Sequence, residues 1–484
     1  MSKAYILAID QGTSSTKAIL FDHKGKVVKK ATAQLKTDYL PNGFVEQDPH
    51  DIVESVKAAC SSCLGGIDTL KISSIGISNQ RETFVLWDKN GKPVHKAIVW
   101  ACKRSTAICD QLKDQEPWLK EKTGLVVDPY FSGTKLLWIL KHKPEILKQI
   151  TKKEIFFGTV DTWLLFKLTN GKSFYTDHSN ASRTLFFNIH KLTWDSEIIE
   201  KWNLTGLQLP EIKASADDFG VTDLFGLLPK NIPVTAMIGD SHGAMFGETC
   251  FEKGDTKMTL GTGCSLLMHI GNKPLNSNER LLSTIGWSTK LEVVYAWEGA
   301  IVACGSMVEW LKSLQIISNA EETAAMAMGV GEPSDIYLVP AFGGLGAPFW
   351  QMNRKASIHG LTFGTRNEHL VKATLESISF QIKAVVEAMQ KDLKFPIKQI
   401  AMHGGLSKNE FIRLSLSDLL DATIQTQDNV DISAQGAAFL AGLQVGIFKD
   451  LKEIKSLVHL QTLKKNKTHS AINEKYDKWR ILIK

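Results

Sequence analysis

The chain begins with two apolar segments joined by a short polar turn, and this pattern constrains the fold more than any other feature. Tyr5–Ile9 and Ala18–Phe21 have the composition of strands, and the turn between them carries Asp10, Gly12 and several hydroxyl residues. A glycine lets bare backbone amides approach an anion, and neighbouring hydroxyls add donors. Because a carboxylate meets a phosphate only through a cation, Asp10 implies bound Mg²⁺. A simple hairpin turn with exposed polar side chains and no bound ligand fits these residues equally well.

A second turn of the same kind lies far downstream. Gly261 and Thr262 stand in the polar segment Leu260–Ser265, which leads into the apolar run Leu266–Met268. Two phosphate-type turns, each beside a strand, indicate two related lobes that close on one nucleotide.

The length of the chain agrees with two lobes. One core is not expected at 484 residues, so we predict two large domains, 1–248 and 249–484. No low-complexity linker marks the boundary, and we therefore expect a packed hinge.

Composition excludes several classes of protein. The net charge of +6 comes from scattered residues, and the most basic run, Leu463–Lys467, lacks interleaved aromatics, so we expect no nucleic-acid partner. The sequence shows no signal peptide and no apolar run long enough for a bilayer, which predicts a cytoplasmic protein without membrane contact. Seven cysteines do not form a disulfide framework, and we expect Cys60 and Cys63 to be structural.

Alternation of strands and helices predicts the α/β class, with layers of helices on a sheet. The first three strands have the turn punctuation of an antiparallel meander. The expected strands are Tyr5–Asp10, Lys17–Asp22, Val27–Leu35, Ile72–Ser78, Thr83–Asp88, Val234–Ile238, Lys257–Leu260, Ser265–Ile270, Val293–Trp297 and Ile400–His403, and the clearest helices are Pro49–Leu64 and His369–Met389.

Ordered motifs along nearly the whole chain carry a family resemblance. They are Ile9–Thr13, Gly76–Thr83, Tyr130–Lys135, Thr176–Thr184, Gly239–Asp240, Gly261–Cys264, Gly344–Pro348 and Gly404–Asn409. With these motifs the chain resembles the FGGY family of carbohydrate kinases, and within that family the glycerol kinases. The resemblance implies two actin-like (ribonuclease H-like) domains with a cleft between them, the first binding a polyol and the second a nucleotide. It also implies phosphorylation of glycerol to sn-glycerol 3-phosphate with ATP and Mg²⁺, and a homodimer or homotetramer.

Asp240 resembles the catalytic base of that family, which accepts the proton of the attacking hydroxyl. Taken alone, this carboxylate is more typical of a helix N-cap. Asp10 is the implied second catalytic residue and the metal ligand. The implied nucleotide-binding residues are Thr13, Ser14, Ser15, Lys17, Thr262, Gly305, Glu309, Gly405 and Asn409. Lys17 stands where these kinases usually have Arg, and Glu309 stands where they have Gln.

By the same resemblance, the polyol is bound by Arg81, Glu82, Trp100, Tyr130, Asp240, Ser241 and Ser265. Outside the family comparison, Arg81 and Glu82 are more typical of a solvated ion pair. Ser241 replaces a Gln of the glycerol kinases, and Ser265 replaces a Phe. The resulting roomier, more polar pocket could take a longer polyol, such as a tetritol or pentitol.

Two other classes of protein share this fold. An actin-like ATPase hydrolyses ATP without an acceptor and has no use for the implied polyol set. A non-catalytic sugar sensor needs neither Asp10 nor Asp240. The residues therefore favour a kinase over both alternatives.

Overall fold

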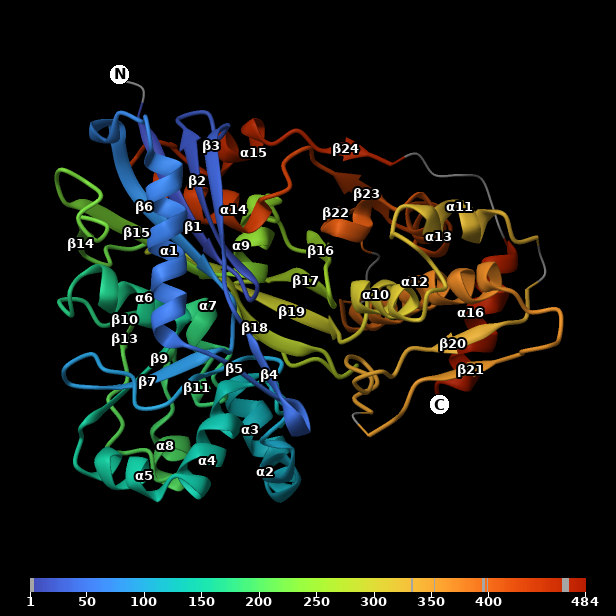
Figure 1. The fold of residues 1–484 in the computed structure, drawn as a ribbon, viewed down its shortest axis with the longest axis horizontal. Helices are drawn as coiled ribbons and strands as arrows, with labels where there is room; N and C mark the ends of the chain where they lie inside the picture. The colour runs from blue at the N-terminus through green and yellow to red at the C-terminus, as the bar shows by residue number, and fades with distance from the viewer. Residues whose placement is uncertain (1–3, 332–333, 352, 394–396, 398, 464–469) are drawn as a thin grey trace.

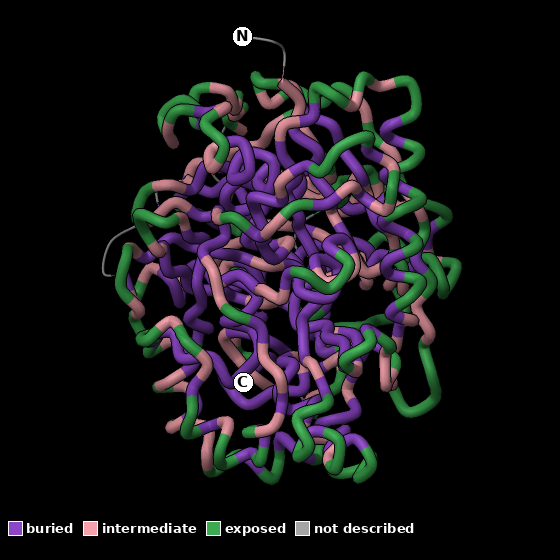
Figure 2. Tube along the Cα trace, turned by 90° about the vertical axis from the view of Figure 1, so that its left-hand side faces the viewer, coloured by how far each residue is buried: buried purple, intermediate pink, exposed green. Residues whose placement is uncertain are grey.

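The computed structural model describes residues 4–331, 334–351, 353–393, 397, 399–463 and 470–484. Two large sheets dominate the molecule, and they lie side by side in Figure 1, the first in blue and green, the second in yellow and orange. Buried residues fill the interior around both sheets, and exposed residues line the rim (Figure 2).

The first sheet is built around the N-terminal meander. Its order is β14-β15-β6-β1-β2-β3, in which β1, β2 and β3 are antiparallel while β6 and β15 run parallel to β1. The strands are β1 (Tyr5–Gln11), β2 (Ser15–Asp22), β3 (Val27–Gln34), β6 (Ile72–Asn79), β14 (Val221–Thr222) and β15 (Ile232–Gly239). Helix α1 (Pro49–Leu64) packs on β2 and β3.

The second sheet repeats this plan. Its order is β18-β19-β17-β16-β22-β23-β24, with β16, β17 and β19 antiparallel and β22 and β23 parallel to β16. The strands are β16 (Thr256–Leu260), β17 (Cys264–Gly271), β18 (Leu282–Ser288), β19 (Val293–Ile301), β22 (Gln399–His403), β23 (Thr423–Thr426) and β24 (Gln461–Thr462). The shared topology confirms the prediction of two related lobes.

Two helices cross between the sheets. Helix α9 (Asp240–Gly247) follows the last parallel strand of the first sheet, and α14 (Ile432–Gln444) follows the last parallel strand of the second. Although it comes from the C-terminal half, α14 packs on β1, β6 and β15, and Figure 1 shows it in red beside the blue strands. One apolar cluster includes residues of both helices and both sheets. The hinge is therefore packed, as expected, whereas the division at residue 248 stays a prediction.

A third, five-stranded sheet of order β4-β5-β8-β7-β9 extends the first lobe. Its strands are β4 (Asp38–Leu40), β5 (Phe44–Gln47), β7 (Phe84–Asp88), β8 (Ala97–Ile98) and β9 (Ile155–Thr159). The segment after β8 and the segment before α4 (Ser132–His142) both reach the space between the large sheets, and they carry Trp100 and Tyr130.

The remaining elements are shorter or lie at the periphery. The helices are α2 (Thr106–Gln111), α3 (Glu116–Thr123), α5 (Pro144–Thr151), α6 (Val160–Leu168), α7 (His178–Ala181), α8 (Ser196–Lys201), α10 (Gly305–Ser313), α11 (Glu322–Met328), α12 (Asn367–Leu393), α13 (Glu410–Leu419), α15 (Leu451–Leu457) and α16 (Ser470–Leu482). Three two-stranded sheets pair β10 (Tyr175–Asp177) with β13 (Glu211–Lys213), β11 (Phe187–Asn188) with β12 (Thr193–Trp194), and β20 (Tyr337–Val339) with β21 (Ser357–His359).

Other expectations from the sequence are also tested by the fold. Cys60 and Cys63 are buried in α1 and not disulfide-bonded, which confirms their structural role. Among the described residues, no helix has the length and apolarity needed to cross a bilayer. Most of the basic run Leu463–Lys467 lies outside the described residues.

Candidate active site

A cavity of about 470 Å³ opens between the two large sheets. It gathers residues from opposite halves of the chain. Its lining includes seven of the residues implied by the family resemblance, namely Arg81, Trp100, Tyr130, Asp240, Ser241, Thr262 and Ser265. The implied polyol pocket and one implied phosphate turn therefore share one space.

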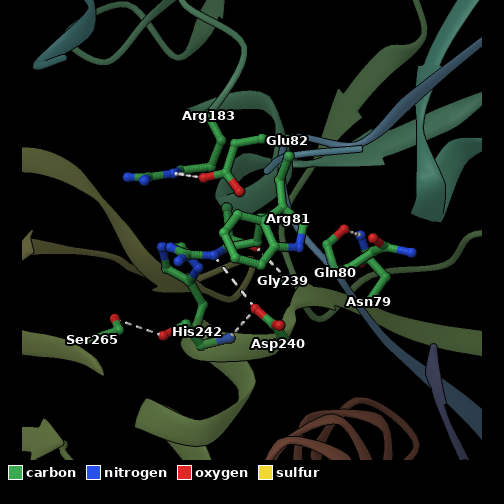
Figure 3. A network of polar contacts seen from close by, with 12 residues as sticks. Asn79, Gln80, Arg81, Glu82, Arg183, Gly239, Asp240, His242 and Ser265 are labelled. Atoms are coloured by element: carbon green, nitrogen blue, oxygen red, sulfur yellow. Dashed lines mark hydrogen bonds and ion pairs between the residues drawn. The ribbon is translucent and has the colours of Figure 1, made fainter. Parts of the chain in front are cut away.

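Asp240 is the first residue of α9, and the N-cap of that helix is Gly239. The N-cap interpretation of Asp240 is therefore wrong by one position. Its Oδ1 accepts a hydrogen bond from the amide of Ser241 at 2.6 Å and lies 3.4 Å from Nε of Arg81, a contact visible in Figure 3. With 43% of its side chain exposed, the carboxylate has a free side toward the cavity.

Arg81 and Glu82 are both buried, so the interpretation of a solvated ion pair is wrong. Arg81 Nη2 donates to Glu298 at 2.8 Å. Glu82 accepts from Arg183 Nε at 2.6 Å, a contact that Figure 3 shows. Arg183 also lies 2.7 Å from the second oxygen of Glu298. Two arginines and two glutamates thus alternate in a buried network beneath the cavity.

The charges of this network stabilise one another. Burial alone would raise the pKa of Glu298, but the charges of Arg183 and Arg81 hold it well below its ordinary value. Burial alone would lower the pKa of Arg81, whereas Glu298 and Glu82 raise it. Arg81 is therefore charged, and its Nη1 is buried without a partner among the described residues. Because a guanidinium has donors and no acceptor, Arg81 can only donate to a molecule in the cavity that it lines.

Trp100 and Tyr130 form the aromatic side of the cavity. Their rings meet edge to face with centroids 5.8 Å apart, and the Tyr130 hydroxyl accepts from Arg81 at 3.3 Å. The indole nitrogen of Trp100 donates to Thr13 Oγ1 at 2.8 Å. Thr13 therefore contacts the wall of the implied polyol pocket, and its contact with the nucleotide stays a prediction.

Asp10 is the penultimate residue of β1, at the edge of the same region. Burial raises the pKa of its carboxyl to about 6, against the charge of Lys17, and the carboxylate of Asp240 adds to the rise. Ser78 donates to Asp10 at 3.0 Å. A cation placed beside Asp10 would relieve this repulsion. Among the described residues no group of three acidic, histidine or cysteine ligands forms, so phosphate and water would complete the coordination.

Lys17 is already paired. Its Nζ lies 2.8 Å from Asp431, at the start of α14, and Lys30 contacts the other oxygen of the same carboxylate at 3.1 Å. Its side chain stays 37% exposed, so Lys17 can contact a phosphate while it remains close to Asp431. Ser14 is exposed in the first turn and Ser15 half-buried at its end.

The second turn packs on the start of α10. The amides of Cys304 and Ser306 both donate to the carbonyl of Thr262 at 3.1 Å, and a Cβ on Gly305 would crowd the carbonyl of Gly261 at 2.6 Å. A glycine at position 305 therefore allows the turn and the helix to approach closely.

Three further residues are implied to contact the nucleotide, namely Glu309, Gly405 and Asn409. Glu309 is exposed on α10, and Gly405 is exposed beyond β22 with open space where a Cβ would stand. Asn409 caps α13 by accepting from the amide of Ile412 at 3.1 Å, and it donates to Thr323 at 2.9 Å. Its side chain has a structural role, and the nucleotide contacts of all three residues stay predictions.

Sequence reasoning missed three buried residues of this site: Arg183, Lys257 and Glu298. The signal for Glu298 was present, because a carboxylate interrupts the apolar run Val293–Ile301. Arg183 lies in the motif Thr176–Thr184, but the sequence alone assigned it no role. Lys257 begins a predicted strand, a position where a lysine is usually solvated.

Comparison with known proteins agrees with this geometry. The N-terminal domain profile of the FGGY family of carbohydrate kinases matches residues 5–247, and the C-terminal domain profile of that family matches residues 256–445. The chain belongs to the FGGY family of carbohydrate kinases. As an FGGY kinase it is a phosphotransferase, which sets aside the alternatives of an actin-like ATPase and a sugar sensor.

Curated FGGY relatives share more than the fold. Glycerol kinase 2 of Thermotoga maritima is 45% identical over 99% of this chain and 98% of that protein. A glycerol kinase of Francisella tularensis subsp. holarctica is 42% identical over 100% of this chain and 98% of that protein.

Solved FGGY structures give the same picture. The Plasmodium falciparum glycerol kinase with ADP superposes with a TM-score of 0.89 at 34% identity, covering 99% of this chain and 98% of that one. A gluconate kinase from Lactobacillus acidophilus, at 22% identity and a TM-score of 0.88 over 100% of this chain and 97% of that one, supports the two-domain fold.

Proposed function

We propose that this chain transfers the γ-phosphoryl group of ATP to glycerol and forms glycerol 3-phosphate. The observation that carries the proposal is the single cavity in which Asp240 meets Arg81, Trp100 and Tyr130 on one side and Thr262 on the other. The full-length similarity to glycerol kinases supports glycerol as the acceptor.

The chemistry follows from the positions of these groups. Phosphoryl transfer depends chiefly on orientation and on charge neutralisation. The free side of Asp240 accepts the proton of the attacking hydroxyl, and Arg81, which lines the same cavity, donates to the polyol and orients it. Thr262 and the first turn orient the phosphates. Mg²⁺, beside Asp10, would neutralise phosphate charge when bound.

A panel of alcohols tests the acceptor. We expect kcat/KM, measured by ADP release, to be highest for glycerol among three-, four- and five-carbon polyols. A clear preference for a tetritol or pentitol would identify the longer polyol as the substrate, a result that Ser241 and Ser265 in the cavity wall would explain. Equal ADP release with and without any polyol would contradict the proposal altogether. Cytoplasmic location and assembly into dimers or tetramers stay predictions.

A further inference from the structure

Lys257 is a completely buried ammonium group below the cavity. Its Nζ donates to Ser241 Oγ, to Thr259 Oγ1 at 3.0 Å and to the Ser265 carbonyl at 3.3 Å, with Ser265 Oγ at 3.4 Å. In the part of the chain that the structure describes, no ion pair joins Nζ to a carboxylate. Three hydroxyls that line the cavity therefore surround one buried cation.

This arrangement fixes which way the hydroxyls point. An ammonium group has three donors and no acceptor, so each hydroxyl that meets Lys257 must accept from it. A hydroxyl carries one proton, which it then donates to another partner.

One chain of hydrogen bonds leads to Glu298. Ser265 donates to the Glu298 carboxylate at 3.1 Å, so its only proton is used there. Ser241 and Ser265 lie 3.0 Å apart, and Ser241 must therefore be the donor between them. The donors run in one direction, from Lys257 through Ser241 and Ser265 to Glu298.

A second chain leads away from the cavity. Thr259 Oγ1 lies 2.9 Å from Nε2 of His403, and Nδ1 of that ring lies 3.1 Å from the buried carboxylate of Glu248. These contacts fit either direction for the proton of Thr259, so only the first chain fixes the direction of a hydroxyl at the cavity wall.

The chain through Ser241 and Ser265 determines the hydrogen-bonding character of the cavity wall. Ser241 keeps a free lone pair and no free proton, so at this hydroxyl the wall accepts a hydrogen bond and donates none. The opposite side, at Arg81, only donates, because a guanidinium has no acceptor. A substrate hydroxyl can satisfy both sides, because it donates to one and accepts from the other. A carbonyl oxygen would face the lone pairs of the serine side without a proton between them.

We propose that Lys257 determines specificity for an alcohol over a carbonyl at the carbon next to the attacking hydroxyl. Ser241 is bonded through its amide to Asp240, so its wall faces that part of the substrate. Lys257 acts through the hydroxyls and is a positioning residue. The inference rests on the proposed function, and it predicts discrimination between glycerol and dihydroxyacetone, the three-carbon compound with a carbonyl in that place.

The test compares two substrates in the wild type and in Lys257→Met. Removing the ammonium lets the hydroxyls turn and donate to a carbonyl. We expect the ratio of kcat/KM for glycerol to that for dihydroxyacetone to fall about tenfold, mainly through KM for glycerol, because Asp240 is unchanged. Lys257→Arg keeps a donor-only group and should retain most of the ratio. Lys383→Met, at a partly buried lysine of α12, is the matched control and should leave the ratio unchanged.

Each outcome decides something. A wild type that does not phosphorylate glycerol overturns the proposed function, whereas glycerol turnover with an unchanged ratio in Lys257→Met overturns only this inference. If Lys257→Met shows no thermal unfolding transition, Ser241→Ala provides the same test without removing the buried charge. Ser241→Ala deletes the accepting hydroxyl, so the ratio of kcat/KM for glycerol to that for dihydroxyacetone should again fall. An equal loss of kcat/KM for both substrates would mean that the hydroxyl has only a structural role, and would contradict the inference.

Discussion

At the scale of single residues, Asp240 is the group on which transfer depends. Asp240→Asn keeps the shape of the side chain but removes the proton acceptor, so we expect kcat to fall about 10³-fold. Nucleotide affinity should stay within a fewfold of the wild type, as measured by calorimetry. Asp68→Asn, at an exposed carboxylate outside the cavity lining, is the control. Unchanged turnover in Asp240→Asn would remove Asp240 from its assigned role.

The charge of Lys257 gives the selectivity a pH dependence. Burial lowers the pKa of Lys257 to about 8, and Arg81 lowers it further, against Glu298, Asp240 and Cys264, which raise it. Below pH 8 the ammonium fixes the hydroxyls; above it, the neutral amine can accept a proton from them. The ratio of kcat/KM for glycerol to that for dihydroxyacetone should therefore fall as pH rises through about 8 in the wild type. In Lys257→Met the ratio should not change with pH, and a parallel change in both proteins would contradict this account.

Residue roles differ in how well the sequence predicts them. Asp240 could be found because it follows a strand inside a family motif. The link from Lys257 to Glu298 could not be predicted, because it runs through Ser265 on a neighbouring strand, and no local pattern records which side chains of separate strands meet. The contact of Thr13 with Trp100 was likewise invisible, since 87 positions separate them in the sequence.

At the scale of elements, the crossing of α9 and α14 depends on glycines. A Cβ on Gly436 would overlap the carbonyl oxygen of Gly243, and a Cβ on Gly247 would overlap that of Ile432. Backbone touches backbone at this crossing, so neither helix can move aside without disturbing a sheet.

Gly436→Ala tests this crossing. We expect the free energy of unfolding to fall by about 1–3 kcal/mol, because the added methyl must push the helices apart. Urea denaturation measures the change. Gln444→Ala, at the half-buried end of the same helix, should change stability by about 0.5 kcal/mol or less. Equal stabilities of the two variants would show that the crossing tolerates a side chain.

Elements with strong local patterns were predicted well. The predicted bounds agree with the observed ones within a few residues for the N-terminal meander, for α1 and for α12. Strand β18 was missed, because its serines, threonine and glycine weaken the apolar signal, although the neighbouring strand and Met245 bury it. The packing of α14 on the first sheet could not be predicted, because it depends on contacts between distant parts of the chain. The small residues of this helix indicated only that it packs closely against a neighbour.

At the scale of the whole molecule, one cavity shared by two halves predicts coupled binding. If polyol and nucleotide bring the halves together, each should increase the affinity for the other by the same factor. We expect glycerol to tighten the binding of a non-hydrolysable ATP analogue at least about fivefold in calorimetry. Arg81→Met, which removes the donor to the polyol, should abolish this effect. Affinities that are independent in the wild type would contradict a shared site.

The return of α14 to the first sheet also affects how the protein is made. A ribosome releases the strands of that sheet long before it reaches Ile432, so the nascent N-terminal half has no cover for the face on which α14 packs. Residues such as Ile6 and Phe21, completely buried in the finished protein, would stay in contact with water or a chaperone during this interval. The N-terminal half therefore completes its core only when translation is almost finished.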